Sequence, residues 1–138
     1  MLNSSPSRRT VLVGAALLLA GLAHPASAQS RERVKFAKGN DNTSVNGKVT
    51  GAGYHDYLLG AKAGQTMAVS LITDGSAYFN ILPPGSTDVA IHNSSIDGND
   101  ATGIKLPKSG DYTIRVYLMG ADADGGATVP FTLSMGIS

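Results

Sequence analysis

The sequence has 138 residues, with 11 basic and 10 acidic side chains, no cysteine and no tryptophan. The near-zero net charge excludes the basic footprint of a nucleic-acid-binding protein. The lack of cysteine excludes disulfides, thiolate metal sites and a cysteine nucleophile. A chain of this length allows one domain with one modest hydrophobic core.

The first 28 residues have the features of a secretory signal peptide. Ser7-Arg8-Arg9 supply positive charge, Val11 to Ala23 form an uncharged apolar run, and Ala26-Ser27-Ala28 is a small-x-small cleavage site. The arginine pair also resembles the start of a twin-arginine export motif. The apolar run is short for a membrane span, which needs about 20 residues. We therefore predict cleavage after Ala28 and a single domain over residues 29–138, located in a bacterial periplasm without membrane attachment.

Short alternating segments, separated by clusters of Gly, Asn, Asp and Pro, predict strands along the rest of the chain. The predicted strands are 33–38, 43–50, 54–61, 66–73, 77–82, 88–92, 102–106, 112–119 and 128–137. Segments 94–100 and 120–126 are predicted loops. Eight or nine short strands at this spacing favour an all-β fold, an antiparallel β-sandwich of jelly-roll type or a barrel.

The final predicted strand contains Pro130, which cannot donate a hydrogen bond to a neighbouring strand. We therefore expect one side of this strand to be open at Pro130. Two copies of the chain could pair through such an edge, so a homodimer is a further expectation.

The most regular strand pattern follows a polar turn. Pro107 fixes φ, Gly110 permits positive φ, and Ser109 and Asp111 can bond their own backbone. Apolar and polar residues then alternate from Tyr112 to Met119, as in a half-buried strand. A turn with a hydroxyl and a lysine, Lys108, therefore precedes the strongest strand of the chain.

Catalytic residues are not evident. His55 and Asp56 are adjacent, so on a strand they point to opposite faces and cannot act as base and orienting acid. We interpret His55 and His92 as ordinary strand residues, and the single glutamate, Glu32, lies near the amino end of the predicted domain. No nucleophile elbow, zinc-protease motif or phosphate loop occurs. We predict that the protein is not an enzyme.

Two acidic segments, Asp97 to Asp100 and Asp122 to Gly126, resemble fragments of calcium loops. Both lack the closing glutamate that such a loop needs. We predict no metal and no cofactor, with calcium binding only if the two segments meet in space.

Tyr112 has two interpretations. Its position in the alternation places it on the same face as Ile114 and Val116, so the ring could cap the core as in a tyrosine corner. Spacing alone favours this interpretation. The ring could also lean on the edge of the core while its hydroxyl reaches past the rim.

Ser109-Gly110-Asp111-Tyr112 matches the Ser-Gly-x-Tyr signature of bacterial periplasmic lysozyme inhibitors. The resemblance extends through the domain, to segments 34–39, 56–57, 61–66, 78–85 and 112–119. Together these segments resemble the inhibitors of invertebrate-type lysozyme and their sister group, the inhibitors of goose-type lysozyme.

The resemblance implies a periplasmic protein that inhibits lysozyme, with the invertebrate type favoured and the goose type as the second choice. In the family, the signature loop enters the active-site cleft. Carried over, Ser109 would donate to a catalytic carboxylate, Tyr112 would place its phenol nearby, and Gly110 would allow close approach of the backbone. Lys108 adds a favourable charge at the tip, and Asp111 completes the loop. Segments 94–100 and 120–126 are candidates for further contacts with the enzyme.

Two other classes of protein remain open. One is a carbohydrate- or peptidoglycan-binding sandwich without inhibitory activity, with Tyr54, Tyr57, Tyr78 or Tyr117 as aromatic platforms. The other resembles the jelly-roll modules that accompany secreted peptidases.

Overall fold

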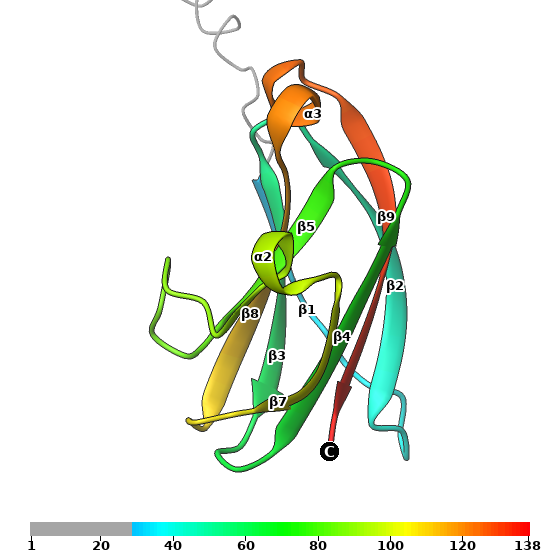
Figure 1. Cartoon of the computed structure of the whole chain (residues 1–138). Coiled ribbons are helices and arrows are strands. Elements are labelled where there is room, and N and C mark those ends of the chain that lie inside the picture. The colour runs from blue at the N-terminus through cyan, green and yellow to red at the C-terminus, as the bar shows by residue number, and fades with distance from the viewer. Residues whose placement is uncertain (1–28) are drawn as a thin grey trace, which may run out of the picture.

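The computed structural model describes residues 29–138; the predicted signal peptide lies outside the described residues. The chain forms a sandwich of two β-sheets (Figure 1). The five-stranded sheet has the order β1-β3-β8-β5-β6, and the four-stranded sheet has the order β2-β9-β4-β7. The strands are β1 (Gln29–Arg33), β2 (Asn42–Thr50), β3 (Tyr54–Ala61), β4 (Thr66–Thr73), β5 (Ala77–Leu82), β6 (His92–Asn93), β7 (Asp100–Lys105), β8 (Gly110–Leu118) and β9 (Thr128–Ile137). The predicted all-β sandwich is confirmed.

The core lies between the sheets and is built from the apolar members of the alternating patterns. In β8, β9 and β4 the inward positions are buried and the outward ones are more exposed. The largest fully buried side chains include Tyr57, Tyr112, Phe79, Met67, Ile81, Ile114, Leu133 and Met135. Burial of these apolar surfaces is the main force that holds the sheets together. No disulfide contributes, because the sequence contains no cysteine.

The predicted first strand, 33–38, is wrong. β1 ends at Arg33, where the predicted strand begins, and pairs in parallel with β3, whereas residues 34–37 have no regular structure. All five residues of β1 are polar and exposed, so no apolar pattern marks this strand. Val34 and Phe36 pack against the core while the chain crosses from one sheet to the other, which explains their alternation.

The predicted strand 88–92 is also wrong, because only His92–Asn93 pairs with β5. Ser86 closes a local turn: its hydroxyl donates to the carbonyl of Val89 and accepts from the N–H of Val89. This turn keeps the chain out of the sheet, and the loop 83–91 projects from the side of the sandwich (Figure 1).

The predicted polar loops each contain one helical turn. These turns are α2 (Ser94–Asp97), capped by the side chain of Asn93, and α3 (Gly120–Asp124). α3 lies at one end of the sandwich, and α2 lies beside β5 and β7 (Figure 1). Within residues 29–138, no helix is long and apolar enough to cross a membrane.

Pro130 lies in β9, which is a central strand between β2 and β4. The pairing of β9 with β4 stops at Phe131, opposite Thr73, so Pro130 faces only Lys48 of β2. β9 is therefore unpaired on its β4 side only around Pro130. The edges of this sheet are β2 and β7, so β9 itself is not an edge strand.

Candidate functional site

The turn 106–109 enters β8 at the end of the sandwich where β3 also turns into β4. Ser109 is exposed, and its hydroxyl oxygen accepts the N–H of Ala63 at 2.8 Å. The backbones of the two turns are joined as well, because the N–H of Gly64 donates to the carbonyl of Leu106 at 2.8 Å. The second turn therefore fixes the position of Ser109. Within the described chain, the proton of the Ser109 hydroxyl has no recorded acceptor, so it remains available to a partner.

Tyr112 is fully buried, with 0% of its surface exposed. Its hydroxyl donates to the carbonyl of Lys108 at 2.7 Å and accepts the N–H of Lys108 at 3.0 Å. This is the tyrosine-corner arrangement that spacing alone favoured. The expectation that the hydroxyl reaches past the rim is wrong, because the ring belongs to the core and the backbone of the turn uses both hydrogen-bonding capacities of the phenol.

Gly110 lies next to Pro84 of the loop 83–91. Its φ is +140°, and a Cβ added there would lie 3.1 Å from both Cβ and Cγ of Pro84. Any other residue would bring both backbone strain and a tight contact. Glycine at this position therefore lets the turn rest on Pro84 of the same chain.

Asp111 pairs with Arg33 of β1 through two hydrogen bonds, of 3.0 and 2.6 Å. The guanidinium of Arg33 lowers the pKa of Asp111 from its ordinary value, mainly through its hydrogen bonds. Both side chains are about half exposed. The carboxylate of Asp111 is thus neutralised by Arg33 of β1. Lys108 has no recorded ion-pair partner within residues 29–138, so it carries the uncompensated charge of the turn.

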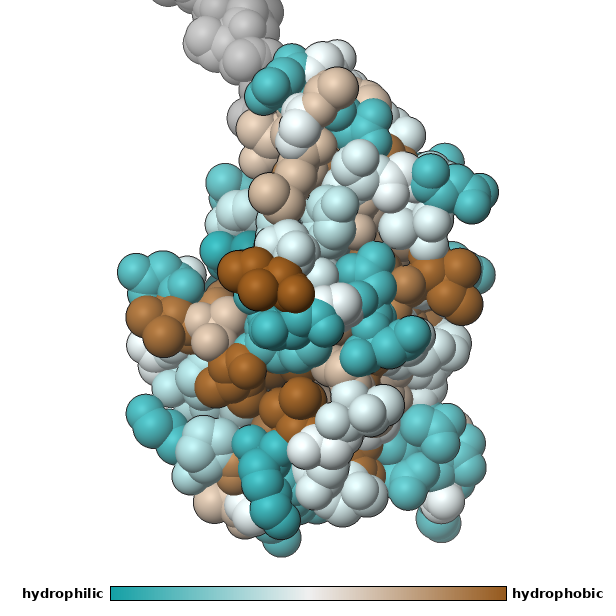
Figure 2. Space-filling model, viewed as in Figure 1, coloured by the Kyte–Doolittle hydropathy of each residue, from teal (hydrophilic) through white to brown (hydrophobic). Residues whose placement is uncertain are grey.

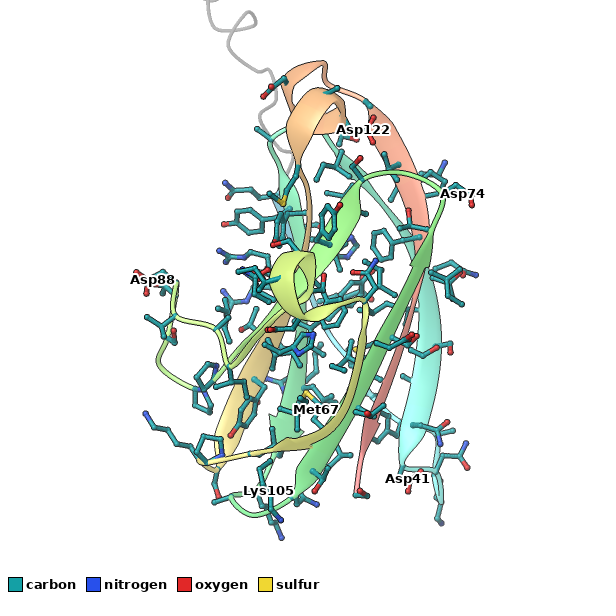
Figure 3. The ribbon with its side chains drawn as sticks, viewed as in Figure 1. Asp41, Met67, Asp74, Asp88, Lys105 and Asp122 are labelled. Atoms are coloured by element: carbon teal, nitrogen blue, oxygen red, sulfur yellow. The ribbon has the colours of Figure 1, made fainter. Side chains whose placement is uncertain are left out.

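Positive charge gathers at this end of the molecule. Lys105 ends β7 opposite Thr66, Lys62 lies in the turn before β4, and Lys108 lies in the candidate turn. None of these lysines has an ion-pair partner among the pairs recorded in residues 29–138. Figure 3 shows Lys105 at the end opposite to Asp74 and Asp122. The candidate turn therefore lies beside a group of three lysines.

A hollow of about 360 Å³ lies directly beside the turn, lined by Pro83, Pro84, Gly85, Ser86, Val89 and Lys108. Val89 is 70% exposed, which is unusual for a large apolar side chain. In Figure 2, brown apolar side chains gather on this face over the loop 83–91 and α2. The surface around the turn is thus partly apolar and partly cationic.

The expected extra contact segment 120–126 is at the wrong end of the molecule. It follows the far end of β8, and the length of that strand separates it from Ser109 by about 25 Å. The turn 62–65 and the loop 83–91 are the real neighbours. Segment 94–100 lies farther along β5, where Ser94 accepts the N–H of Phe79. Sequence reasoning missed the neighbours because they come together only through the pairing of β3, β8 and β5.

The two histidines within residues 29–138 do not form a catalytic arrangement. His55 points between the sheets, stacks on Tyr57 and lies 3.0 Å from Glu32, whereas Asp56 points outward and pairs with Arg115. The prediction that His55 and Asp56 do not pair is confirmed. His92 is buried and bonds the carbonyl of Gly98.

The two acidic segments do not meet to form a calcium site. Asp97 accepts the N–H of Asn93, and Asp122 accepts the N–H of Ser76, so both carboxylates serve their own loops. Among residues 29–138, no group of three or more possible metal ligands occurs.

Comparisons with known proteins relate this sandwich to inhibitors of lysozyme. No family model matches the chain. An inhibitor of g-type lysozyme from Escherichia coli (strain K12) is 30% identical over 127 residues, covering 89% of this chain and 93% of that protein. The crystal structure of PliG from Aeromonas hydrophila, a periplasmic inhibitor of g-type lysozyme, is 37% identical, with a TM-score of 0.74 over 80% of this chain and 97% of that one.

A pre-peptidase C-terminal domain of a collagenase from Bacillus anthracis shares the fold alone. It is 14% identical, with a TM-score of 0.53, and the match covers 83% of this chain and 99% of that domain. At this identity, the likeness to a peptidase module supports the sandwich architecture and says nothing of function.

Fold and site together define a small β-sandwich that presents a rigid, cationic turn. The chain belongs to the family of periplasmic inhibitors of g-type, or goose-type, lysozyme. The periplasmic location predicted from the sequence is supported by the neighbouring structures. The preference for invertebrate-type lysozyme gains no support, because these relatives are described as inhibitors of the g-type enzyme.

Proposed function

We propose that this protein inhibits goose-type lysozyme in the periplasm by inserting the turn 106–110 into the active-site cleft. The observation that carries the proposal is the state of Ser109: the hydroxyl is exposed, its oxygen accepts the N–H of Ala63, and its proton remains free. A hydroxyl fixed in this way is ready to donate to a carboxylate. Lysozymes cleave glycans with the help of acidic side chains in such a cleft.

The other residues of the signature have supporting roles in this mechanism. Tyr112 holds the turn in shape through the backbone of Lys108 and makes no direct contact with the enzyme. Gly110 lets the turn lie against Pro84, and Arg33 holds Asp111. The enzyme therefore meets the backbone of the turn, Ser109 and Lys108. The chain blocks the cleft and supplies no catalytic group.

The lysines at this end strengthen the proposal. Lys62, Lys105 and Lys108 create a positive surface that attracts an acidic cleft over a distance, which raises the association rate most at low salt. A hydrogen bond to a charged group contributes about 1.5–3 kcal/mol. One such bond gives weak binding, so a surface of about 800 Å² per partner must surround the turn. The turn 62–65 and the loop 83–91 are placed to supply it.

Inhibition assays with the exported form, residues 29–138, test the proposal. The protein is titrated against goose-type, invertebrate-type and chicken-type lysozymes in parallel. We expect inhibition of the goose-type enzyme and a loss of about tenfold or more in affinity for Ser109→Ala, with unchanged stability. Ser44→Ala, on the outer face of the other sheet, is the matched control and keeps full inhibition. Parental inhibition by Ser109→Ala would exclude the turn as the inhibitory element.

A further inference from the structure

Three tyrosines form a row across the outer face of the five-stranded sheet. Tyr54 of β3 pairs in register with Tyr117 of β8, and Tyr117 pairs in register with Tyr78 of β5. The rings of Tyr78 and Tyr117 are 6.4 Å apart between centroids. All three side chains are partly exposed. At the usual strand spacing, the row is about 10 Å long.

A polar row lies directly beside the tyrosines. Asp56, Arg115 and Asn80 pair across the same three strands, two residues along each strand and on the same outer face. Arg115 donates two hydrogen bonds to Asp56, at 2.8 and 2.9 Å, and its guanidinium carbon lies 3.9 Å from the centroid of the Tyr54 ring. The arginine is therefore held rigidly, and its charge is balanced by Asp56.

The remaining polar groups complete a fixed surface. The hydroxyl of Tyr117 shares its single proton between the side-chain oxygens of Asn80 and Asn93, each 3.2 Å away. A hollow of about 250 Å³ adjoins Tyr54 and Asp56 and is lined by Gln29, Ser30 and Arg31 of β1. The face thus combines aromatic rings, amides, a partly exposed guanidinium and a small polar recess.

We infer that this face is a second binding site, for a neutral glycan chain built of N-acetylated amino sugars. A sugar ring has an apolar C–H face that packs on an aromatic ring and a rim of hydroxyls that needs paired donors and acceptors. The row of rings meets the first need, and the partly exposed Arg115 and Asn80 meet the second, with Asp56 buried behind Arg115. The internal neutralisation of Arg115 by Asp56 favours a ligand without charge, and the recess beside Tyr54 suits an acetamido group.

This site is separate from the candidate inhibitory turn. Tyr117 is seven positions along β8 from Gly110, a distance of about 23 Å. The glycan site therefore does not rest on the proposed inhibition of lysozyme. Tyr57, which the sequence also offered as a platform, points into the core and is not part of the row.

Titration of the ¹⁵N-labelled exported form with chitotetraose, followed by amide chemical shifts, tests the inference. We expect saturable shifts in the outward-facing rows of β3, β8 and β5, with a dissociation constant in the millimolar range or tighter. Tyr54→Leu and Tyr78→Leu each remove one ring and should weaken binding about fivefold, the scale of one aromatic contact. Ile72→Ala, on the outer face of the other sheet, should leave binding unchanged.

Several outcomes would overturn the inference. One is the absence of saturable shifts in the parent protein, which needs no variant to interpret. Another is a set of shifts confined to the four-stranded sheet or to the turn around Ser109. Equal affinity for maltotetraose, which lacks acetamido groups, would contradict the assignment of N-acetylated sugars. Lysozyme inhibition by Tyr54→Leu and Tyr78→Leu should remain at the parental level, which separates the two sites.

Discussion

The phenol of Tyr112 holds both backbone groups of Lys108, donating to its carbonyl at 2.7 Å and accepting its N–H at 3.0 Å. The buried ring thus anchors the turn to the core at the residue just before Ser109. A partner that binds Ser109 meets a turn whose shape is already set, so it loses less conformational entropy on binding.

Removal of this anchor should loosen the turn without removing any atom that contacts the lysozyme. Tyr112→Phe keeps the ring in the core but leaves both backbone groups of Lys108 without their partner. We expect a loss of about 1–2 kcal/mol in the free energy of unfolding, together with weaker inhibition of goose-type lysozyme. Urea unfolding and inhibition assays measure the two effects. Tyr78→Phe, on the outer face, is the control and should change neither; equal behaviour of the two variants would argue against the anchor.

Gly110 should not tolerate a side chain. Gly110→Ala places a Cβ 3.1 Å from Pro84 at a φ of +140°, so we expect a destabilisation of about 1–3 kcal/mol and displacement of the turn. Gly60→Ala is the matched control, because its added Cβ would meet Asp111 at an ordinary 3.5 Å. Thermal unfolding compares the pair. The close approach to Pro84 is unimportant if both variants unfold at the parental temperature.

Val89 should contribute to binding of the enzyme and little to the fold. Its side chain is 70% exposed and lines the hollow next to Lys108. Val89→Asp removes apolar contact area and places a negative charge beside the positive turn, so we expect inhibition to fall about tenfold. Ile72→Asp is the control, since Ile72 is 66% exposed on the other sheet. Surface plasmon resonance with immobilised lysozyme distinguishes the variants, and equal losses would exclude a specific role for the hollow.

Tyr57 should make the protein sensitive to alkali. Its hydroxyl is buried, and no hydrogen-bond partner is recorded for it within residues 29–138. Burial, with a smaller contribution from the charge of Glu32, raises the pKa of Tyr57. Below the ordinary tyrosine pKa of about 10, the phenol is neutral in both states and stability does not depend on it. Above that value the unfolded phenol ionises and the folded one does not, so stability falls as pH rises.

Tyr57→Phe tests this relation. The variant lacks the unsatisfied hydroxyl, so we expect a gain of about 1 kcal/mol at neutral pH and a smaller loss of stability above about pH 10. Some loss should remain, because burial also raises the pKa of Tyr117. Urea unfolding at neutral and alkaline pH measures both effects. A variant that is less stable than the parent at neutral pH would show that the hydroxyl has a partner.

Most strands could be predicted because their side chains alternate between core and solvent. β3, β4, β5 and β9 begin and end where the sequence pattern predicts. β1 could not be predicted, since it is polar, exposed and held by backbone pairing with β3. The predicted strand 88–92 is wrong because Ser86 turns the chain away from the sheet, although Ile91 still packs on the core.

For the candidate site, local sequence was enough to place the turn and its signature, because Pro107, Ser109 and Gly110 act through their own backbone. The role of Tyr112 was ambiguous, and only the packed sheets show that its hydroxyl is inside. The neighbours of Ser109, the charge at its end of the sandwich and the row of tyrosines depend on which strands lie side by side. Local alternation shows which side chains of a strand face the core, but strand order depends on backbone pairing between segments far apart in the chain, which no short stretch of sequence records.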